Sequence, residues 1–276
     1  MLDIKFESGT NFFDLNDFAT ENNIDRYALL NAAFIQDVLI TEEQIMLLNF
    51  IKSIEKKGDV IKSQLFQDAF AAFIVGNVFD KTFLEFGATD GFDLSNSFML
   101  ENRLGWSGVL AEPSPQWHKQ LKGNRPNTPI ITDCIWKCSG EKLDFFVSDV
   151  GVLSTLSAYV MSDLSSMPGN TSERIKNGKM VEVQTISLND VMKKNFNGNA
   201  PSYLSIDTEG SEYEILNSLD FDKYRPIVLT VEHNFSNLEI KIDKLMNSNG
   251  YGRVFKDLTS FDAWYVRSDV LATMEI

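Results

Sequence analysis

The sequence is poor in the residues that most often bind transition metals. It contains only two cysteines, Cys134 and Cys138, and only two histidines, His118 and His233. The cysteine spacing does not match the usual zinc pairs, so no structural zinc site is expected. Cysteine is among the most frequently buried residues, and we expect both to be buried reduced thiols. His118, beside Trp117 in an expected helix, is predicted to lie on the surface.

Long hydrophobic runs and basic clusters are also missing. No apolar stretch approaches the roughly 18 residues of a membrane-spanning helix, so none is expected. The N-terminus carries Asp3 and Glu7 and lacks the basic-then-apolar pattern of a secretory signal, which predicts a cytoplasmic protein. The formal net charge is −14. Such a surface repels phosphate backbones, so nucleic acid is not an expected partner.

The 276 residues, 43% of them hydrophobic, suffice for one large domain with an extension. Residues 1–62 are predicted to form a helical extension. Within it, Ile24–Ile40 is apolar on more than one face, Thr41–Gln44 has the form of a capping box, and Leu48–Ile54 has apolar residues at helical spacing. The extension carries no recognisable chemistry. Docking to a partner, covering the site and forming a homo-oligomer all stay open for it.

Residues 63–276 are predicted to form an α/β domain, because strand and helix patterns alternate from about residue 63. Repeated β-α units imply a parallel sheet with right-handed crossovers, and the last two strands suggest an antiparallel hairpin at its edge. Residues 149–178 have little periodicity and are interpreted as an insertion over the site. Helices are expected over Gln64–Ile74, Leu94–Leu104, after Ser211 and around Leu238–Met246. Strands are expected over Thr82–Phe86, Gly108–Ala111, Pro129–Thr132, Lys142–Ser148, Lys179–Ile186, Tyr203–Ile206, Ile227–Val231, Tyr251–Phe255 and Ala263–Val266.

A carboxylate and a glycine turn mark the end of the first expected strand, Phe83-Leu-Glu85-Phe-Gly87-Ala-Thr-Asp90-Gly91. The turn is G-x-x-x-G rather than the G-x-G-x-x-G of dinucleotide binders, which favours S-adenosylmethionine (SAM) over NAD. Glycine lets the backbone approach a ligand, and Glu85 can accept from the amino group of SAM. Asp90 either assists or caps the next helix. A tight turn without a ligand is the alternative for the whole stretch.

The next strand also ends in an acid, Glu112, and Pro113 then stops it. An acid at this position can accept both ribose hydroxyls of an adenosine ligand. Its distance of 25 residues from Gly87 fits one β-α-β unit. Asp133-Cys134 follows the third strand, where a polar group can meet the adenine amino group. A solvated strand-end acid and an ordinary turn aspartate are the structural alternatives.

Three acids crowd a later strand end in the segment Ser205-Ile-Asp207-Thr-Glu209-Gly-Ser211-Glu-Tyr-Glu214. Ser211 and Glu214 fit a capping box, and acids in a first helical turn complement the helix dipole. That local role does not account for Asp207, which falls at the carboxyl edge where open α/β sheets bind ligands.

The strand after that ends in Glu232-His233-Asn234. Adjacent strands would bring Asp207 near Glu232 and His233. Carboxylates and an imidazole can bind a divalent metal. His233 can instead take a proton from a substrate hydroxyl, because its pKa lies near neutrality. A polar strand end with a solvated histidine is the third interpretation.

Taken in order, these motifs resemble those of FkbM-type SAM-dependent methyltransferases. The resemblance runs from about Ser63 to Val266. Its motifs are Ser63-Gln64-Leu-Phe-Gln67-Asp68, the Phe83–Gly91 stretch, Ser95-Asn96 with Leu100-Glu101, Gly105-Trp-Ser-Gly-Val-Leu-Ala-Glu112-Pro113, Ser187-Leu-Asn-Asp190-Val and Leu204-Ser-Ile-Asp207-Thr-Glu209-Gly-Ser-Glu212. It implies a Rossmann-like class I methyltransferase fold with a seven-stranded, mostly parallel sheet and a C-terminal antiparallel hairpin. It also implies SAM as methyl donor and, usually, O-methylation of sugars or polyketide-type natural products.

The resemblance also implies roles for individual residues. Glu85 and Gly87 would face the methionine part of SAM, Glu112 the ribose, and Asp133 the adenine. The residues expected to bind or border the cofactor are Gln67, Glu85, Gly87, Ala88, Asp90, Gly91, Glu112, Pro113, Asp133, Cys134 and Asp207. Related small-molecule methyltransferases hold Mg²⁺ with acids at the ends of the fourth and fifth strands. Asp207, Glu232 and His233 stand in matching places and are expected to bind Mg²⁺ or Mn²⁺, with His233 in place of the usual second acid.

The sequence therefore predicts a SAM-dependent methyltransferase that methylates a hydroxyl of a glycan or small metabolite. A metal at Asp207 and Glu232 would lower the pKa of the acceptor hydroxyl and anchor it, and His233 or Glu209 would be the base if no metal binds. A nicotinamide oxidoreductase on a Rossmann sheet is the alternative enzyme class, against which the missing third glycine counts. A non-catalytic module that keeps the fold to bind a partner is the other alternative.

Overall fold

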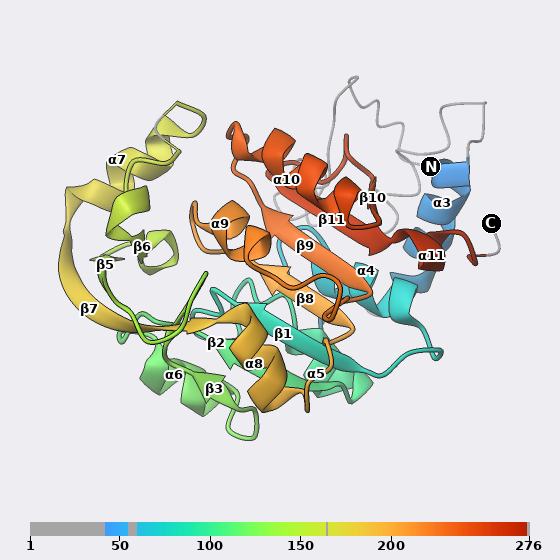
Figure 1. Cartoon of the computed structure of the whole chain (residues 1–276), viewed down its shortest axis with the longest axis horizontal. Coiled ribbons are helices and arrows are strands. Elements are labelled where there is room, and N and C mark those ends of the chain that lie inside the picture. The colour runs from blue at the N-terminus through green and yellow to red at the C-terminus, as the bar shows by residue number, and fades with distance from the viewer. Residues whose placement is uncertain (1–41, 55–59, 164, 275–276) are drawn as a thin grey trace, which may run out of the picture.

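A seven-stranded sheet runs through the middle of the computed structural model, which describes residues 42–54, 60–163 and 165–274. Its strand order is β10-β11-β9-β8-β1-β2-β3, and only β11 runs antiparallel to its neighbours (Figure 1). This arrangement confirms the predicted class I methyltransferase sheet with its closing hairpin. The strands are β1 Thr82–Phe86, β2 Ser107–Ala111, β3 Ile130–Ile131, β8 Tyr203–Ile206, β9 Val228–Glu232, β10 Tyr251–Val254 and β11 Asp262–Arg267.

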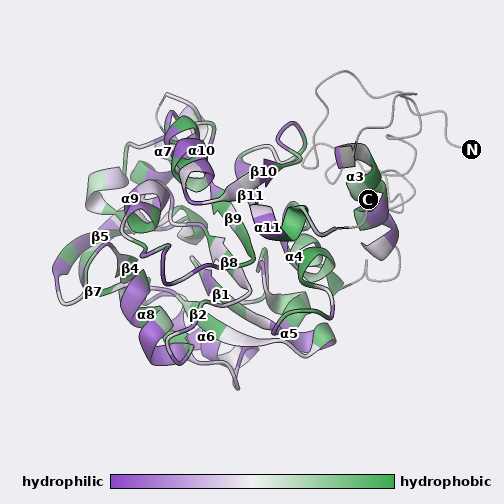
Figure 2. Ribbon diagram, turned by 45° about the vertical axis from the view of Figure 1, so that its right-hand side comes forward, coloured by the Kyte–Doolittle hydropathy of each residue, from purple (hydrophilic) through white to green (hydrophobic). Residues whose placement is uncertain are grey.

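Helices cover both faces of this sheet, so its central strands are buried along nearly their whole length. Figure 2 shows hydrophobic residues along β8 and β9 and a largely hydrophilic α8 on the outside. Helix α8 begins where the Ser187 side chain accepts a hydrogen bond from Asp190 N. The helices are α4 Gln67–Val75, α5 Phe98–Leu104, α6 His118–Asn124, α8 Leu188–Asn195, α9 Glu212–Asn217, α10 Leu238–Ser248 and α11 Ser268–Leu271.

Two expected helices begin later than predicted. Helix α5 starts at Phe98 rather than Leu94, because Leu94 has a φ of 61° and the segment after it wraps around Glu85. Helix α4 starts at Gln67 rather than Gln64, because Phe66 has a φ of 68°. Left-handed backbone at either position ends helical geometry there.

Helix α3, Glu42–Ile54, packs against the methyltransferase core. The Phe50 ring is fully buried and lies 5.7 Å from the Phe70 ring and 6.2 Å from the Trp264 ring. The predictions for Ile24–Ile40 and for Thr41 fall outside the described residues, and the domain boundary at residue 62 stays a prediction. Within the described part of the chain, no helix has the length and apolar character needed to cross a bilayer.

Residues 149–178, interpreted from the sequence as an insertion over the site, connect two strands of a second sheet, β5 and β7, near the ranges predicted for them. A four-stranded sheet in the order β4-β7-β5-β6 stands beside the main sheet, at the left of Figure 1. We call residues 149–163 and 165–178 the cap. The strands of the second sheet are β4 Cys134–Trp136, β5 Lys142–Ser148, β6 Thr155–Leu156 and β7 Gly178–Ser187, of which β6 lies within the cap. The cap also contains the short helices η2 Gly151–Leu153 and η3 Ser157–Tyr159, and α7 Pro168–Lys176.

Candidate active site

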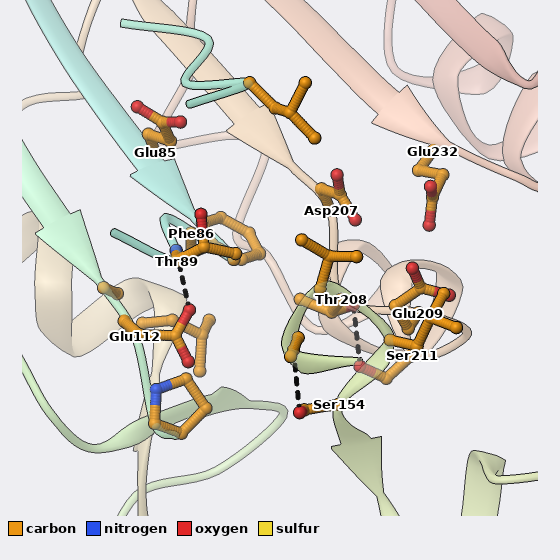
Figure 3. Close-up of a pocket in the computed structure, with 18 of the residues that line it drawn as sticks. Glu85, Phe86, Thr89, Glu112, Ser154, Asp207, Thr208, Glu209, Ser211 and Glu232 are labelled. Atoms are coloured by element: carbon orange, nitrogen blue, oxygen red, sulfur yellow. Dashed lines mark hydrogen bonds between the residues drawn. The ribbon is translucent and has the colours of Figure 1, made fainter. Parts of the chain in front are cut away.

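A cavity of about 310 Å³ opens where the carboxyl ends of β1, β2, β8 and β9 meet the cap. Ligand pockets in proteins have volumes of about 300–1,000 Å³. Strand-end residues form one wall, and cap residues from Gly151 to Leu156 with Met167 and Asn170 form the other (Figure 3). Among the described residues that line it, none is basic and five are acidic: Glu85, Glu112, Asp207, Glu209 and Glu232.

The carboxylate of Glu85 is held at the tip of β1 by the loop before α5. Asn96 N donates to Glu85 Oε1 at 2.8 Å, and the hydroxyls of Ser95 and Ser97 donate to Oε2. Burial raises the pKa of Glu85, while Arg125 and these hydrogen bonds oppose the shift. Asn96 Oδ1 is buried and has no hydrogen-bond partner among the described residues, and Asn96 lines the cavity. An unpartnered acceptor next to Glu85 suits a ligand that brings N–H donors.

Buried Arg125 supports this loop, although no sequence motif pointed to it. Its guanidinium donates to the hydroxyls of Ser95 and Ser97 at 3.4 and 3.2 Å and to Glu101 Oε2 at 2.6 Å. Arg125 thus fixes the serines that fix Glu85, although it does not line the cavity itself.

Gly87 is required where β1 and β8 approach each other. A Cβ on Gly87 would lie 1.7 Å from the carbonyl oxygen of Asp207, and the residue has a φ of 81°. The Gly87 and Ala88 N–H groups both donate to Ala111 O, at 3.1 and 3.2 Å. Gly87 lines the cavity, whereas Ala88 is buried behind it. The glycine therefore serves the packing of two strand ends as well as access for a ligand.

Asp90 and Gly91, two predicted cofactor residues, do not line the cavity. Asp90 Oδ1 accepts from the N–H groups of Phe92 and Asp93, both at 2.9 Å, which is a local turn role. A Cβ on Gly91 would lie 2.5 Å from the Leu121 side chain, so this glycine makes room for α6. The structure thus favours the local interpretation for both residues.

Glu112 and Pro113 line the cavity at the end of β2. Glu112 accepts from Thr89 N at 2.8 Å and from Ser114 N at 2.7 Å. Burial raises its pKa to about 7, and the two backbone hydrogen bonds oppose that shift. His118, predicted to be a surface residue, is half-buried, and its Nε2 lies 2.8 Å from the carbonyl oxygen of Glu112. His118 therefore supports the turn that carries this acid.

The predicted adenine end of the cavity contains Cys134 but not Asp133. Cys134 is buried and reduced, and burial raises its pKa to about 12; Cys138 is also reduced but only half-buried. Ile135 and Phe145, which the sequence did not single out, line the cavity from the second sheet. An apolar wall of this kind suits an aromatic ring. The alternation in Lys142–Ser148 was the available signal for Phe145.

Gln67 lies behind the site rather than in it. Its Nε2 donates to Asp262 Oδ2 at 3.1 Å, and its Oε1 accepts from Leu65 N at 2.8 Å. It therefore ties α4 to β11. Gln64, three residues earlier, does line the cavity.

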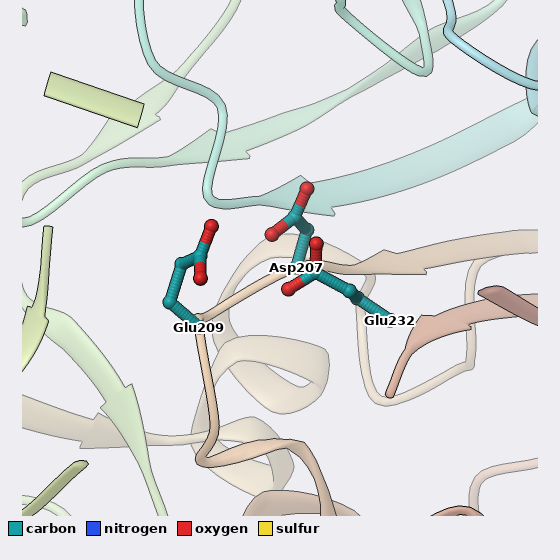
Figure 4. Close-up of side chains that lie close together, drawn as sticks. All are labelled: Asp207, Glu209 and Glu232. Atoms are coloured by element: carbon teal, nitrogen blue, oxygen red, sulfur yellow. The ribbon is translucent and has the colours of Figure 1, made fainter. Parts of the chain in front are cut away.

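Asp207, Glu209 and Glu232 form a compact acidic group, which we call the acid triad. One oxygen of each carboxylate lies within 4.8 Å of the others (Figure 4). Glu232 Oε2 is buried and has no hydrogen-bond partner among the described residues. Burial and the nearby Glu212 raise the pKa of Asp207 to about 7. Burial and the Asp207 charge raise the pKa values of Glu209 and Glu232, and for Glu209 Arg174 opposes the shift without cancelling it.

His233 does not join the acid triad, contrary to the predicted metal and base role. Its Nδ1 accepts from Phe235 N at 3.1 Å, and its Nε2 lies 3.2 Å from Asp262 O. Burial lowers its pKa to about 4, so the ring is neutral near pH 7. His233 does not line the main cavity. Glu209, predicted only as a base, takes the place in the group that His233 was expected to fill.

The family model for the methyltransferase FkbM domain matches residues 85–253, more than half of the chain. The chain belongs to the FkbM methyltransferase family. That membership confirms the resemblance read from the sequence. The nicotinamide oxidoreductase alternative is set aside.

Several solved methyltransferases are similar to this FkbM-family chain at low sequence identity. Methyltransferase FkbM from Methylobacillus flagellatus KT is 10% identical with a TM-score of 0.42, and the match covers 93% of this chain but only 62% of that one. This chain therefore spans less than two thirds of that relative. The O-methyltransferase from Bacillus cereus, solved in complex with S-adenosylhomocysteine (SAH), is 15% identical with a TM-score of 0.37, covering 87% and 97% of the two chains. No curated protein sequence matches this chain.

The acidic lining of this FkbM-family cavity has the charge that a cationic ligand such as SAM requires. SAM carries a sulfonium and an ammonium group, and buried carboxylates are stabilised by a cationic ligand. Glu85 and Asn96 offer acceptors at one end, Glu112 at the middle, and Ile135 with Phe145 an apolar wall. Asp207 follows β8 and Glu232 ends β9, and both line the same cavity with Glu209.

Proposed function

We propose that this protein transfers the methyl group of SAM to a hydroxyl of a glycan or small metabolite. The observation that carries the proposal is the acid triad, which lies in the same cavity as Glu85 and Glu112. Carboxyl groups with raised pKa values are suited to accept a proton at neutral pH. The cavity thus contains a place for the donor and, beside it, groups able to activate an acceptor.

The reaction needs little covalent work from the protein. SAM supplies a methyl carbon bonded to a positively charged sulfur, and the acceptor oxygen attacks that carbon as the carbon–sulfur bond breaks. The hydroxyl proton passes to a carboxylate, for which Asp207 and Glu209 are the candidates because both line the cavity. The strand ends orient the donor, and the cap excludes water from the space above it.

The charge of the lining also restricts the acceptor. All five charged side chains in the described lining are acidic. Bringing a phosphate or carboxylate beside them would add like charges at low dielectric. Leu94 and Val152, both partly exposed at the cavity, offer apolar contact. We therefore propose a neutral or cationic acceptor with an apolar portion.

Binding of SAH, the product that SAM leaves, tests the donor site. We expect saturable binding by calorimetry, and Glu112→Gln should weaken it about tenfold to a hundredfold, because a hydrogen bond to a charged group contributes roughly 1.5–3 kcal/mol. Glu141→Gln, an exposed acid outside the cavity, is the matched control and should leave the affinity unchanged. Absence of SAH binding by the wild-type protein would instead favour a partner-binding module.

We also propose that the acid triad binds a divalent cation, Mg²⁺ or Mn²⁺, in place of the predicted Asp207, Glu232 and His233 set. Of the three carboxylates only Glu209 pairs with a guanidinium among the described residues, and that Arg174 group also pairs with Asp163, so the acid triad carries excess negative charge when ionised. The unpartnered Glu232 Oε2 is an available oxygen ligand. A bound cation would anchor the acceptor hydroxyl and lower its pKa.

Titration with Mn²⁺ in the absence of SAM checks this cation site. We expect saturable binding that EDTA reverses and that Glu232→Gln weakens at least about tenfold. Glu182→Gln, at an exposed position in β7, should bind Mn²⁺ as the wild-type protein does. If Mn²⁺ does not bind, the acid triad is not a divalent cation site, and this part of the proposal is wrong.

A further inference from the structure

One buried arginine joins the cap to the acid triad. Arg174 lies on α7, is fully buried and forms ion pairs with Asp163 and Glu209. Its Nη2 donates to Glu209 Oε2 at 2.6 Å, and the guanidinium also donates to both oxygens of Asp163, at 2.7 and 3.2 Å. Leu153 O and Val160 O accept the remaining N–H groups, at 2.8 and 3.1 Å. All five donors of the guanidinium are therefore used.

These contacts divide into two kinds. Asp163, Leu153 and Val160 belong to the cap, and Asp163 is also held by Thr171 Oγ1 at 2.6 Å, so they stabilise the cap internally. Glu209 belongs to the loop after β8 and lines the cavity. Arg174 does not line the cavity. Among the described residues, the one hydrogen-bond partner of the Arg174 guanidinium outside the cap is thus a member of the acid triad; the Arg174 carbonyl oxygen also accepts from Ser148 Oγ in β5.

The cap also forms hydrogen bonds with the backbone of the loop after β8. Thr155 Oγ1 lies 3.0 Å from Glu209 O, and Ser162 Oγ lies 3.3 Å from it. A Cβ on Gly210 would lie 2.5 Å from Ser162 Oγ, so the two segments are in close contact. Glu209 has a φ of 59°, a left-handed conformation that costs free energy for a residue with a side chain. Such a conformation persists where surrounding contacts enforce it. Here the cap contacts act together with Glu212, which accepts from the Thr208 and Gly210 N–H groups, and with Asn234, whose Nδ2 lies 3.4 Å from Glu209 Oε2.

We propose that Arg174 is a positioning residue of the methyl transfer, which holds the Glu209 carboxylate beside Asp207 and Glu232 only while the cap is packed over the cavity. The expected effect of Arg174 on turnover rests on the proposed function. The expected effect of Arg174 on the position of Glu209 does not. An acid triad assembled by the cap would be complete only when the acceptor space is covered. The cap would then contribute to catalysis as well as to acceptor choice.

The first experiment needs no acceptor. Hydrogen exchange of residues 207–211 is compared in the wild-type protein, Arg174→Gln, Arg174→Lys and Lys176→Gln. Lys176 is the matched control, since it loses the same charge from the same helix but is exposed and pairs only with Glu173. We expect exchange in this loop to rise about tenfold or more in Arg174→Gln and less in Arg174→Lys, with no change in Lys176→Gln. SAH affinity should stay within about twofold, because Glu85 and Glu112 are held by other contacts.

The second experiment uses an acceptor found by screening. Arg174→Gln should lower kcat about a hundredfold with little change in the KM for SAM, and Arg174→Lys should recover part of the loss. In a Glu209→Gln background the same Arg174 change should add little, because both act through one carboxylate. Additive losses, or equal losses in the Lys and Gln variants, would show a general structural role and overturn the proposal.

If Arg174→Gln does not fold, Thr155→Val replaces it, since this change removes only the hydroxyl that reaches Glu209 O. Faster loop exchange in Thr155→Val with unchanged SAH affinity supports coupling between the cap and the loop, and unchanged exchange contradicts it. Failure of the wild-type protein to bind SAH would refute the proposed function but leave the exchange result to decide the coupling.

Discussion

Replacing Gly87 with alanine should destabilise the protein by at least about 3 kcal/mol and reduce SAH affinity about a hundredfold. The new methyl group would lie 1.7 Å from the Asp207 carbonyl oxygen, at a φ of 81° that disfavours any side chain. Relief requires the tips of β1 and β8 to move apart. These two strands position Glu85 and Asp207, so donor binding and the acid triad should fail together.

Thermal unfolding and SAH calorimetry measure both effects. Gly123→Ala is the matched control, because Gly123 lies within α6, has no left-handed backbone, and would place a new methyl group with no atom within 4 Å. Alanine in a helix is more stable than glycine by about 0.5–1 kcal/mol, so this control should be neutral or slightly stabilised. If Gly87→Ala binds SAH normally, the close approach of the two strands is not what requires glycine there.

The ligand-free protein should lose stability as the pH rises from about 4.5 to 7. Burial raises the pKa values of Asp68, Glu112 and Asp262 to about 7. The folded state therefore holds more protons than the unfolded chain between about pH 4.5 and 7, where unfolded carboxyls are ionised. The stability from each group is complete below the unfolded pKa and disappears as the pH rises through 7. Each contributes a slope of up to about 1.4 kcal/mol per pH unit.

Thermal unfolding at a series of pH values checks this expectation. A loss of about 3 kcal/mol corresponds to a fall in Tm of roughly 6–12 °C for a protein near this size. Asp68→Asn removes one of these three carboxyl groups, and Asp68 does not line the cavity. The Tm of this variant should therefore depend less steeply on pH than that of the wild-type protein. A Tm that rises with pH across this window would mean that the buried carboxyls are ionised in the folded protein.

The strand ends that line the cavity were predictable, because in each of them an acidic residue stands at the end of a short apolar run. The bounds of β1, β5 and β8 agree with the predicted ranges, and Glu85, Glu112 and Asp207 all line the cavity. Short apolar runs bounded by turn residues are a local signal, which one sequence displays in full.

The cap was not predictable in the same way, because its order comes from distant contacts. Strand β6 has two residues, and the two short helices beside it have three each, too few for any periodicity. Arg174 organises the segment through Asp163 and Glu209, 11 and 35 positions away in the chain. No local pattern reveals that these charges meet in the interior.

The placement of His233 away from the acid triad has a simpler cause. Successive side chains along a strand point to opposite faces, so neighbours at a strand end seldom face the same ligand. Glu232 ends β9 and lines the cavity, whereas His233 turns to Asp262 O. Glu209 reaches Asp207 because it lies two residues further along a loop with left-handed backbone. That conformation was not visible in the sequence.

The second sheet separates two kinds of evolutionary constraint. Residues 149–178 leave β5 and return through β7, so insertions or deletions between these strands do not alter the pairing of the main sheet. A change of length in the cap can therefore leave the strand ends that carry Glu85, Glu112 and Asp207 in place. The exception is the pair formed by Arg174 and Glu209, which joins the cap to the loop after β8. Loss of Arg174 would leave the buried Glu209 carboxylate without its cationic partner, whereas Arg174 without Glu209 would still pair with Asp163.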